Sequence, residues 1–529
     1  MKASTLFVAC ITCLFLIGCG QPRDAKIKKV NLYLQNEPNS LDPRKGGDKR
    51  ALQVLRDLFE GLTRIARDGS IELALAQSID VSDDNLIYTF KLHPSQWSNG
   101  ERVTAHDFEY AWKQAVNPEF PTMFAYAYYI IKNAKKAQEG KCSLDDVGVK
   151  ALDDETLELT LEHLTPYLLE YIASPLFAPV CRSVDLADPD WSGKTYPEFV
   201  SNGPFVLKEH MISSQITLEK NPLYWSADKP KSDQLSFAII EDPQTAYNMF
   251  LAGSLDWFGD PFGNMPFEIC RNIQNQKKLD KKPITGCSWI FTNTTSPHLA
   301  SPKIRTAIAS AIDREDLTQN LMSGGEQPLY SLLPKSLSLL DKPFLDKDSP
   351  KKARELFEQS IQELGYTRET YPTLVLSHCS EPVNSLTAEA IQQQLQTNLG
   401  IRVELDAADW NSHLTKISNG EFQLSTCGWF AWFHDSIEFL EVLKNKESKM
   451  NGTGWEREEY IRLLDISDGC EDPKERNIYL KEAEAFIMQE MPLIPLINFT
   501  CKYSKNPNLN GEAMSQAGNL ELKWVEKNI

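Results

Sequence analysis

The sequence predicts a mixed α/β protein that is divided into several domains. Segments that alternate like strands and segments with apolar residues at helical spacing follow one another along the chain. The length of 529 residues is enough for roughly two to four domains. No repeat or low-complexity segment interrupts this order, so layers of helices and strands are favoured over a bundle or a sandwich.

Two segments predict strands and three predict helices. Residues 29–34 (KVNLYL) and 86–92 (LIYTFKL) alternate as half-buried strands do. Apolar residues recur at helical spacing in residues 107–116, 302–312 and 388–399. Pro302 stands just inside the second helix, where the N–H group that proline lacks would have no partner in any case.

The first 18 residues have the composition of an export signal. Lys2 is followed by an apolar run over residues 6–17, which is too short to span a bilayer, and then by Gly18. The quartet Leu-Ile-Gly-Cys at residues 16–19 resembles the bacterial lipobox. This resemblance implies that Cys19 becomes the mature N-terminus, carries acyl chains such as palmitate and anchors the protein to the membrane. The alternative is an unmodified cysteine at the end of a buried helix.

Composition excludes several classes of function. The net charge of −18 argues against nucleic acid, which requires basic patches. No stretch after Cys19 approaches 18 uninterrupted apolar residues, so no later segment is expected to cross a membrane. The eight cysteines after Cys19 form no Cys-x-x-Cys pair, and no His-x-x-x-His is present, so we expect no metal site.

Signatures of catalysis and of cofactor binding are also missing. The sequence contains no Gly-x-x-x-x-Gly-Lys-Ser/Thr, no Gly-x-Gly-x-x-Gly and no Gly-x-Ser-x-Gly. An exported acidic protein of this size with many aromatic residues and no such motif is expected to bind a ligand. We expect neither enzymatic activity nor a cofactor.

Several stretches, in order, resemble the extracytoplasmic solute-binding proteins of peptide ABC transporters, the oligopeptide and dipeptide family. The longest match is residues 76–112, which contain DVSDDNLIYTFKLHPSQWSNGERVTAHDFEYAW. The others are NEPNSLDP (36–43), NGPF (202–205) with LEKNPLYW (218–225), IRTAIASAIDREDL (304–317), LGIRVELDAADW (399–410) and MPLIPL (491–496).

The resemblance implies a periplasmic-binding-protein clamshell, in which two lobes close on a ligand and present it to ABC permease subunits. The first lobe carries an extra domain, so three domains are expected. We expect a signal peptide at 1–18, a lipid-anchored tether at 19–26, a first lobe at 27–66, 198–283 and 498–529, an extra domain at 67–197, and a second lobe at 284–497. The family also implies a monomer.

One position departs from the family at the place that matters most for a peptide ligand. Residues 427–431 (CGWFA) match the family pattern, after which peptide-binding relatives carry an Asp that accepts the α-ammonium group. In this chain that position is Trp432. An indole ring attracts a cation by about 0.5–2 kcal/mol and carries no charge. The resemblance therefore implies that the usual ammonium anchor is missing.

Two acids are candidate ligand contacts: Asp435 as a substitute for this anchor, and Glu37 as an acid that is retained in the cleft. Asp435 lies three residues further on, and Glu37 matches the family residue by residue. Each has a second interpretation: Asp435 as a structural loop acid, and Glu37 as a turn acid before Pro38. The basic residues that help relatives hold a peptide carboxylate are replaced by Thr426 and Ile417.

Four further aromatic residues are candidate ligand contacts. Phe124 and Tyr126 match a stretch of the extra domain that faces the cleft in the family, and Trp410 and Trp429 align with tryptophans of the cleft. Each can equally be an ordinary core residue. Lys416 and His413 are the only basic neighbours expected near this region.

Cys287 and Cys427 are a candidate disulfide. Some relatives have a disulfide that joins the segments around residues 288 and 430, which are Ser288 and Phe430 in this chain. Two separate buried thiols are the alternative.

The sequence thus predicts a lipid-anchored binding protein of an ABC importer for oligopeptides or peptide-related solutes. Two alternatives remain open. One is the same fold adapted to another ligand, such as a glutathione-like peptide or a sugar derivative, and the other is a surface lipoprotein without a role in transport.

Overall fold

The computed structural model describes residues 27–226, 229–322, 324–346, 349–470 and 472–528. The predicted signal peptide, the tether and Cys19 lie outside the described residues. Among the residues that are described, no helix is long and apolar enough to span a bilayer.

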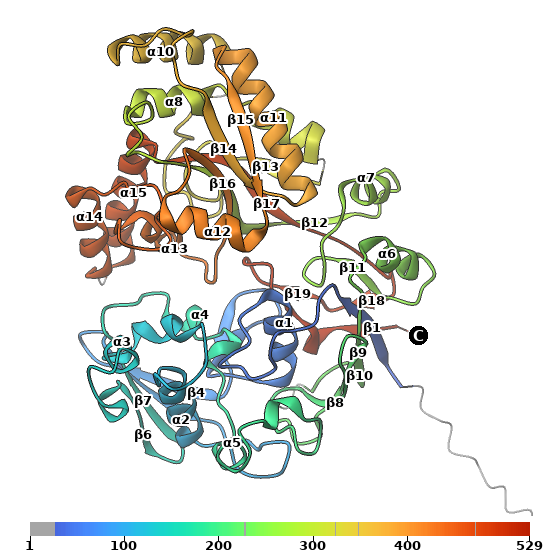
Figure 1. The fold of residues 1–529 in the computed structure, drawn as a ribbon. Coiled ribbons are helices and arrows are strands. Elements are labelled where there is room, and N and C mark those ends of the chain that lie inside the picture. The colour runs from blue at the N-terminus through green and yellow to red at the C-terminus, as the bar shows by residue number, and fades with distance from the viewer. Residues whose placement is uncertain (1–26, 227–228, 323, 347–348, 471, 529) are drawn as a thin grey trace, which may run out of the picture.

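The chain forms two halves, one above the other in Figure 1, and each half has its own core. The lower half has a core of buried residues from 30–284 and 501–525, and the upper half has a core from 287–497. Because one continuous core serves the whole lower half, the separate extra domain at 67–197 stays a prediction.

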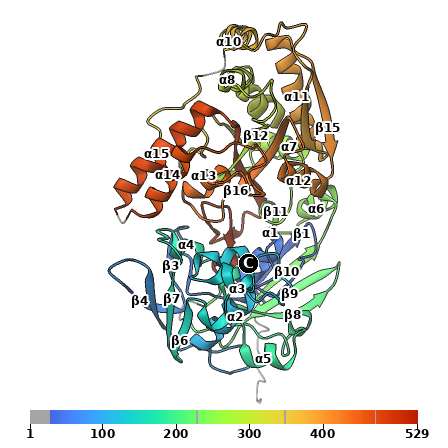
Figure 2. The same cartoon turned by 60° about the vertical axis from the view of Figure 1, so that its left-hand side comes forward.

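The lower half contains two four-stranded sheets. One has the order β1-β10-β9-β8, in which β1 and β10 are parallel, and the other is antiparallel with the order β4-β5-β7-β6. Figure 2 shows them on opposite sides of this half. The strands are β1 Lys29–Leu34, β2 Thr63–Ile65, β3 Ile71–Leu73, β4 Ala76–Val81, β5 Ile87–Leu92, β6 Val149–Asp153, β7 Thr156–Thr160, β8 Phe205–Met211, β9 Gln215–Lys220, β10 Gln234–Ile239, β18 Leu509–Asn510, β19 Ala513–Met514, β20 Leu520–Glu521 and β21 Glu526–Lys527.

Helices pack against these sheets. They are α1 Lys49–Leu58, α2 Ala105–Ala115, α3 Ala134–Gln138, α4 Leu168–Tyr171, α5 Arg182–Ala187, α6 Pro243–Leu251 and α7 Phe267–Asn275, with a 3-10 helix, η1, at Ala125–Ile130. Helix α2 begins two residues before the predicted start. The Asp107 carboxylate accepts the backbone N–H of Thr104 at 2.8 Å, so the first turn forms around this cap.

The upper half is built on most of a seven-stranded sheet with the order β11-β17-β12-β16-β14-β15, in which β13 pairs with β17; its edge strand β11 belongs to the core of the lower half. Its long strands β12 and β17 run from the upper half down to the lower half (Figure 1). The strands are β11 Trp257–Gly259, β12 Asp280–Thr292, β13 Gln327–Pro328, β14 Leu374–Cys379, β15 Val403–Ala408, β16 Leu424–Phe430 and β17 Leu493–Lys505.

Helices surround this sheet. They are α8 Pro302–Ser310, α9 Arg314–Asp316, α10 Pro350–Glu363, α11 Pro382–Leu399, α12 Trp410–Asn419, α13 Ile437–Leu440, α14 Glu458–Asp468 and α15 Pro473–Glu490. Pro302 is the first residue of α8, as predicted. Helix α11 begins six residues before the predicted 388, because its first turns expose Val383 and Leu386 and so lack the buried apolar pattern.

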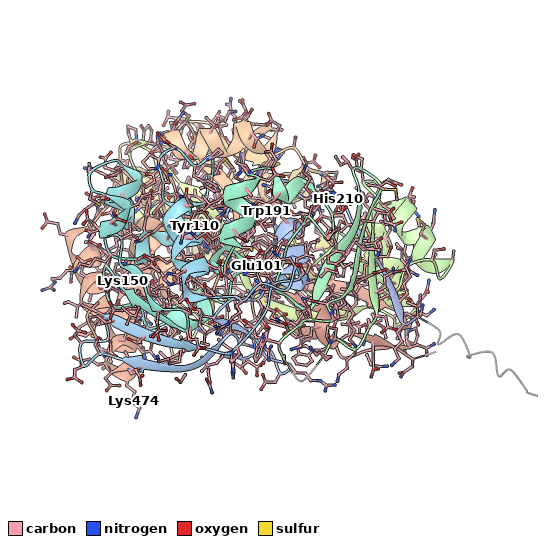
Figure 3. The ribbon with its side chains drawn as sticks, turned by 90° about the horizontal axis from the view of Figure 1, so that it is seen from below. Glu101, Tyr110, Lys150, Trp191, His210 and Lys474 are labelled. Carbon is pink, nitrogen blue, oxygen red and sulfur yellow. The ribbon has the colours of Figure 1, made fainter. Side chains whose placement is uncertain are left out.

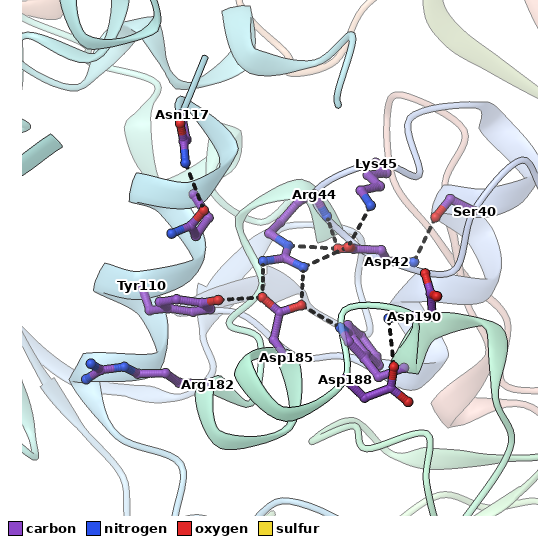
Figure 4. A network of polar contacts seen from close by, with 12 residues as sticks. Ser40, Asp42, Arg44, Lys45, Tyr110, Asn117, Arg182, Asp185, Asp188 and Asp190 are labelled. Atoms are coloured by element: carbon purple, nitrogen blue, oxygen red, sulfur yellow. Dashed lines mark hydrogen bonds and ion pairs between the residues drawn. The ribbon is translucent and has the colours of Figure 1, made fainter. Parts of the chain in front are cut away.

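A buried ionic network ties the loop after β1 to helices α2 and α5 (Figure 4). Arg44 is 1% exposed and donates to Asp42 at 2.8 and 3.0 Å and to Asp185 at 2.7 and 2.8 Å. Asp185 also accepts from Tyr110 at 2.6 Å and from Trp191 at 2.8 Å. Burial opposes ionisation of Asp185, but Arg44 holds its pKa below the ordinary value.

The predicted Cys287–Cys427 disulfide is wrong. In the part of the chain that the structure describes, all eight cysteines carry free thiols. The register of β12 and β16 places Cys287 opposite Trp429 and Cys427 opposite Trp289, so the two cysteines are not paired across the strands. The alternative of two separate thiols is correct.

Candidate functional site

The loop of residues 431–436, between β16 and α13, contacts the lower half. The Trp432 ring lies with its centroid 5.8 Å from that of Tyr126, in η1. The Phe433 ring is stacked on Tyr167, with 4.1 Å between centroids and 12° between planes. Aromatic side chains of this loop therefore form part of the boundary between the halves.

Two residues hold the 431–436 loop from the upper half. The Asp435 carboxylate makes a bidentate ion pair with Arg476 of α15, at 2.7 and 2.9 Å, and accepts the Ile437 N–H at 2.9 Å. Thr285 of β12 contacts the His434 ring at 2.7 Å. The Asp435 carboxylate is thus already paired with a cation of the protein. This pairing agrees with the interpretation of Asp435 as a structural acid of the loop.

Glu438 is an acid at this boundary that the sequence analysis did not select. It lies in the first turn of α13, between the buried Ile437 and Phe439, and it is partly exposed. Burial raises the pKa of Glu438 to about 8, and the nearby Glu441 and Asp435 raise it further. An acid inside the apolar run Ile-Glu-Phe-Leu is a signal that could have identified it.

Two N–H groups lie near the Glu438 carboxylate. The Trp432 backbone N–H and the Trp429 indole N–H both act to lower its pKa, although burial outweighs them. The indole nitrogen is buried, and among the described residues no acceptor lies within normal hydrogen-bond geometry of it. On the lower half, burial and the Glu438 charge raise the pKa of Tyr126 to about 12.

The structure places some of the predicted site residues together and others elsewhere. Phe124 lies next to Tyr126, with 6.5 Å between ring centroids, and Trp429 is stacked near Trp289 at 6.4 Å. Phe124, Tyr126 and Trp432 therefore lie in one boundary region, whereas the ring contact of Trp429 is with the core of the upper half. Trp410 begins α12 and is 48% exposed, without a ring contact to this group.

Glu37 is engaged on a different element. Its carboxylate contacts the His210 ring at 2.6 Å and accepts the Ser213 N–H at 2.8 Å, at the turn between β8 and β9. Figure 3 shows His210 on the opposite side of the view from Lys150 of β6. Glu37 is therefore part of a local hydrogen-bond network in the β8–β9 region.

The two basic residues expected near the site are also engaged in the upper half. Lys416 forms an ion pair with Asp406 at 2.6 Å, and the buried His413 contacts the Thr426 carbonyl oxygen at 2.8 Å. Burial lowers the pKa of His413, which favours the neutral ring. Within the described ranges, no group of three or more His, Cys, Asp or Glu side chains could hold a metal ion.

Comparison with known proteins finds similarity along almost the whole chain. Residues 70–451 match the family of bacterial extracellular solute-binding proteins, family 5 Middle. The oligopeptide-binding protein OppA of Bacillus subtilis is 35% identical over 95% of this chain and 93% of its own length, and the dipeptide-binding protein DppE of the same organism is 34% identical over 93% and 91%. The solved structure of the Escherichia coli murein tripeptide-binding protein MppA superposes with a TM-score of 0.80, at 25% identity, over 95% of this chain and 99% of that one.

Proposed function

Since the chain belongs to the bacterial extracellular solute-binding proteins of family 5, we propose that it binds peptides or peptide-related solutes for an ABC importer. Membership confirms the resemblance seen in the sequence, and the structural similarity to MppA confirms the predicted α/β fold of a periplasmic binding protein. Relatives of this family are binding proteins and not enzymes.

One observation supports a ligand site at the boundary. Trp432 of the upper half and Tyr126 of the lower half face each other at 5.8 Å between ring centroids, beside the partly exposed Glu438. A solute held there contacts both halves, so its binding favours the state in which the halves are together. The names of the two Bacillus subtilis relatives support peptides as the class of solute.

The side chains at this boundary favour a restricted set of peptides over a general one. Trp432 replaces the usual acid, and Asp435 is already neutralised by Arg476. Aromatic rings with one acid suit a short or modified peptide with an apolar or sugar-like surface. A non-peptide solute such as a sugar derivative is the alternative within the same fold.

The remaining parts of the proposal concern location and partners. We propose that residues 1–18 are removed, that Cys19 carries the lipid, and that the protein works as a monomer on the extracytoplasmic face beside permease subunits. A Cys19→Ser variant is expected to leave the membrane fraction, and its retention there would contradict lipid anchoring through Cys19. A surface lipoprotein without transport would show no binding to a permease.

Native mass spectrometry tests the ligand class. The protein that lacks its first 19 residues is purified, and its mass is measured in the native state. It is then denatured, and the molecules that it releases are identified. A set of short peptides supports the proposal. A single molecule that is not a peptide, or an empty protein that does not bind added peptides, contradicts it.

A further inference from the structure

We propose that Glu438, together with the rings of Trp432 and Tyr126, forms a subsite for an ammonium group of the ligand. The inference rests on the proposed function and specifies its chemistry. The acid lies six residues after Trp432, on helix α13, and thus outside the position where relatives carry their anchor.

Within the described residues, no lysine or arginine forms an ion pair with the Glu438 carboxylate, whereas Lys444 and Arg476 pair with the acids Glu441 and Asp435. The acids Glu441 and Asp435 act on this carboxyl and raise its pKa. The neighbouring Asp435 differs from Glu438, because Arg476 binds both of its oxygens. A partly buried carboxylate without a counter-ion is unfavourable, so a cation from outside the protein would stabilise the ionised form of Glu438.

The indole N–H of Trp429 supports a ligand-dependent arrangement. Its nitrogen is buried and has no hydrogen-bond partner in the described part of the chain, and the indole N–H acts to lower the pKa of Glu438. A buried donor without an acceptor is unfavourable. When a cation ionises Glu438, the carboxylate becomes a stronger acceptor for this N–H and for the Trp432 backbone N–H.

Two aromatic rings complete the subsite from opposite halves. Tyr126 is 50% exposed and Trp432 is half-buried, and their centroids are 5.8 Å apart. Aromatic faces attract ammonium groups, and the attraction is greater where water is excluded. A ligand ammonium beside Glu438 would therefore interact with the Glu438 carboxylate of the upper half and with the Tyr126 ring of the lower half.

The composition of the subsite favours an organic ammonium over a metal ion. Hard divalent cations require six or more oxygen ligands, or several carboxylates with water. The described residues offer one unpaired carboxylate here and no cluster of metal-binding side chains. A single acid with aromatic walls is the arrangement that suits an ammonium group.

The ammonium can come from the amino terminus of a peptide or from a lysine side chain, and the experiment distinguishes these sources. The probes are random tri- to pentapeptides without lysine, arginine or histidine, the same mixture N-acetylated, and an N-acetylated mixture with one lysine per peptide. Equal amounts compete for the full-length protein, and the retained peptides are quantified by mass spectrometry. The variants are Glu438→Gln and the control Glu447→Gln, which removes an exposed acid of the same half.

We expect the wild-type protein to prefer a mixture that carries an ammonium group over the acetylated mixture without lysine by about tenfold or more. If the protein prefers peptides with free amino termini, the subsite binds the terminal ammonium group. If it prefers acetylated peptides that contain lysine, the subsite binds the ammonium group of the lysine side chain. Glu438→Gln should reduce this preference to nearly one, whereas Glu447→Gln should retain it.

Two results would overturn the inference in different ways. If the wild-type protein binds peptides without regard to the ammonium group, or if Glu438→Gln keeps the preference, the subsite is wrong while peptide binding stands. If the wild-type protein retains none of the mixtures, the proposed function fails and the subsite fails with it. The preference of the wild-type protein for peptides with an ammonium group is measured without any variant. Misfolding of Glu438→Gln would therefore not obscure that result.

Discussion

The backbone N–H of His434 donates a hydrogen bond to the Glu170 carboxylate at 2.9 Å, from the 431–436 loop of the upper half to helix α4 of the lower half. The stacked pair of Phe433 and Tyr167 lies beside it. These contacts exist only while the two halves are together, so they stabilise the closed arrangement relative to an open one.

The stacked pair leads to a prediction about opening. Tyr167→Ala removes an aromatic contact worth about 0.5–1.5 kcal/mol beyond its buried area. We expect the ligand-free protein to populate the open arrangement more, with a larger radius of gyration in X-ray scattering. Tyr129→Ala is the control, because Tyr129 lies in the same half and contacts Gln138. An unchanged radius for Tyr167→Ala would show that the pair does not contribute to closure.

The ion pair of Asp435 and Arg476 leads to a prediction about stability. Arg476 is buried, so Asp435→Asn leaves a cation without its partner, at a cost of about 3 kcal/mol in the free energy of unfolding. Urea denaturation measures this loss. Asp341→Asn is the control: it breaks an exposed pair with Lys481 of the same helix, which is worth less than about 1 kcal/mol. Equal effects of the two variants would contradict a structural role for Asp435.

Glu438 predicts a dependence of stability on pH. Its pKa is raised to about 8, so the folded state holds a proton that the unfolded state releases near pH 4.5. This contribution is complete below pH 4.5 and is lost as the pH rises through 8. The wild-type protein should therefore lose up to about 1.4 kcal/mol per pH unit relative to Glu438→Gln between pH 5 and 8.

Urea denaturation at several pH values checks this slope. The titratable groups that interact electrostatically with Glu438 include Asp435 and Glu441 from the upper half and Tyr126 and Tyr171 from the lower half. Tyr126 and Tyr171 have raised pKa values and stay neutral in this range, and Glu441 is present in both proteins. Parallel curves for the wild-type protein and Glu438→Gln would show that Glu438 does not titrate there.

The same proton predicts how affinity depends on pH. The Glu438 carboxyl must lose its proton to attract an ammonium group, so affinity for peptides with free amino termini should rise from pH 5.5 to about 7.5. Above this range the α-amino group, with a pKa of about 7.7–8.0, loses its own charge. Titration calorimetry at several pH values tests the rise, which should disappear in Glu438→Gln. A rise that persists in the variant would have to come from another group.

Much of the fold could be predicted from local patterns. Strand β1 matches its predicted bounds, and α8 begins at Pro302 as expected, because alternation and proline position depend on neighbouring residues alone. Helix α11 was predicted too short, since Val383 and Leu386 lie on its exposed face and break the apolar pattern. The family itself could be identified because its motifs are continuous in sequence.

The sequence by itself determined the class of protein, the loss of an acid at position 432 and the presence of an aromatic loop beside it. Only the tertiary structure decided which acid is available to a ligand. Arg476 is 41 residues from Asp435 in the chain and neutralises it, while no lysine or arginine of the described residues forms an ion pair with Glu438. Such pairing depends on which side chains meet when distant helices pack, and no spacing within the loop contains that information.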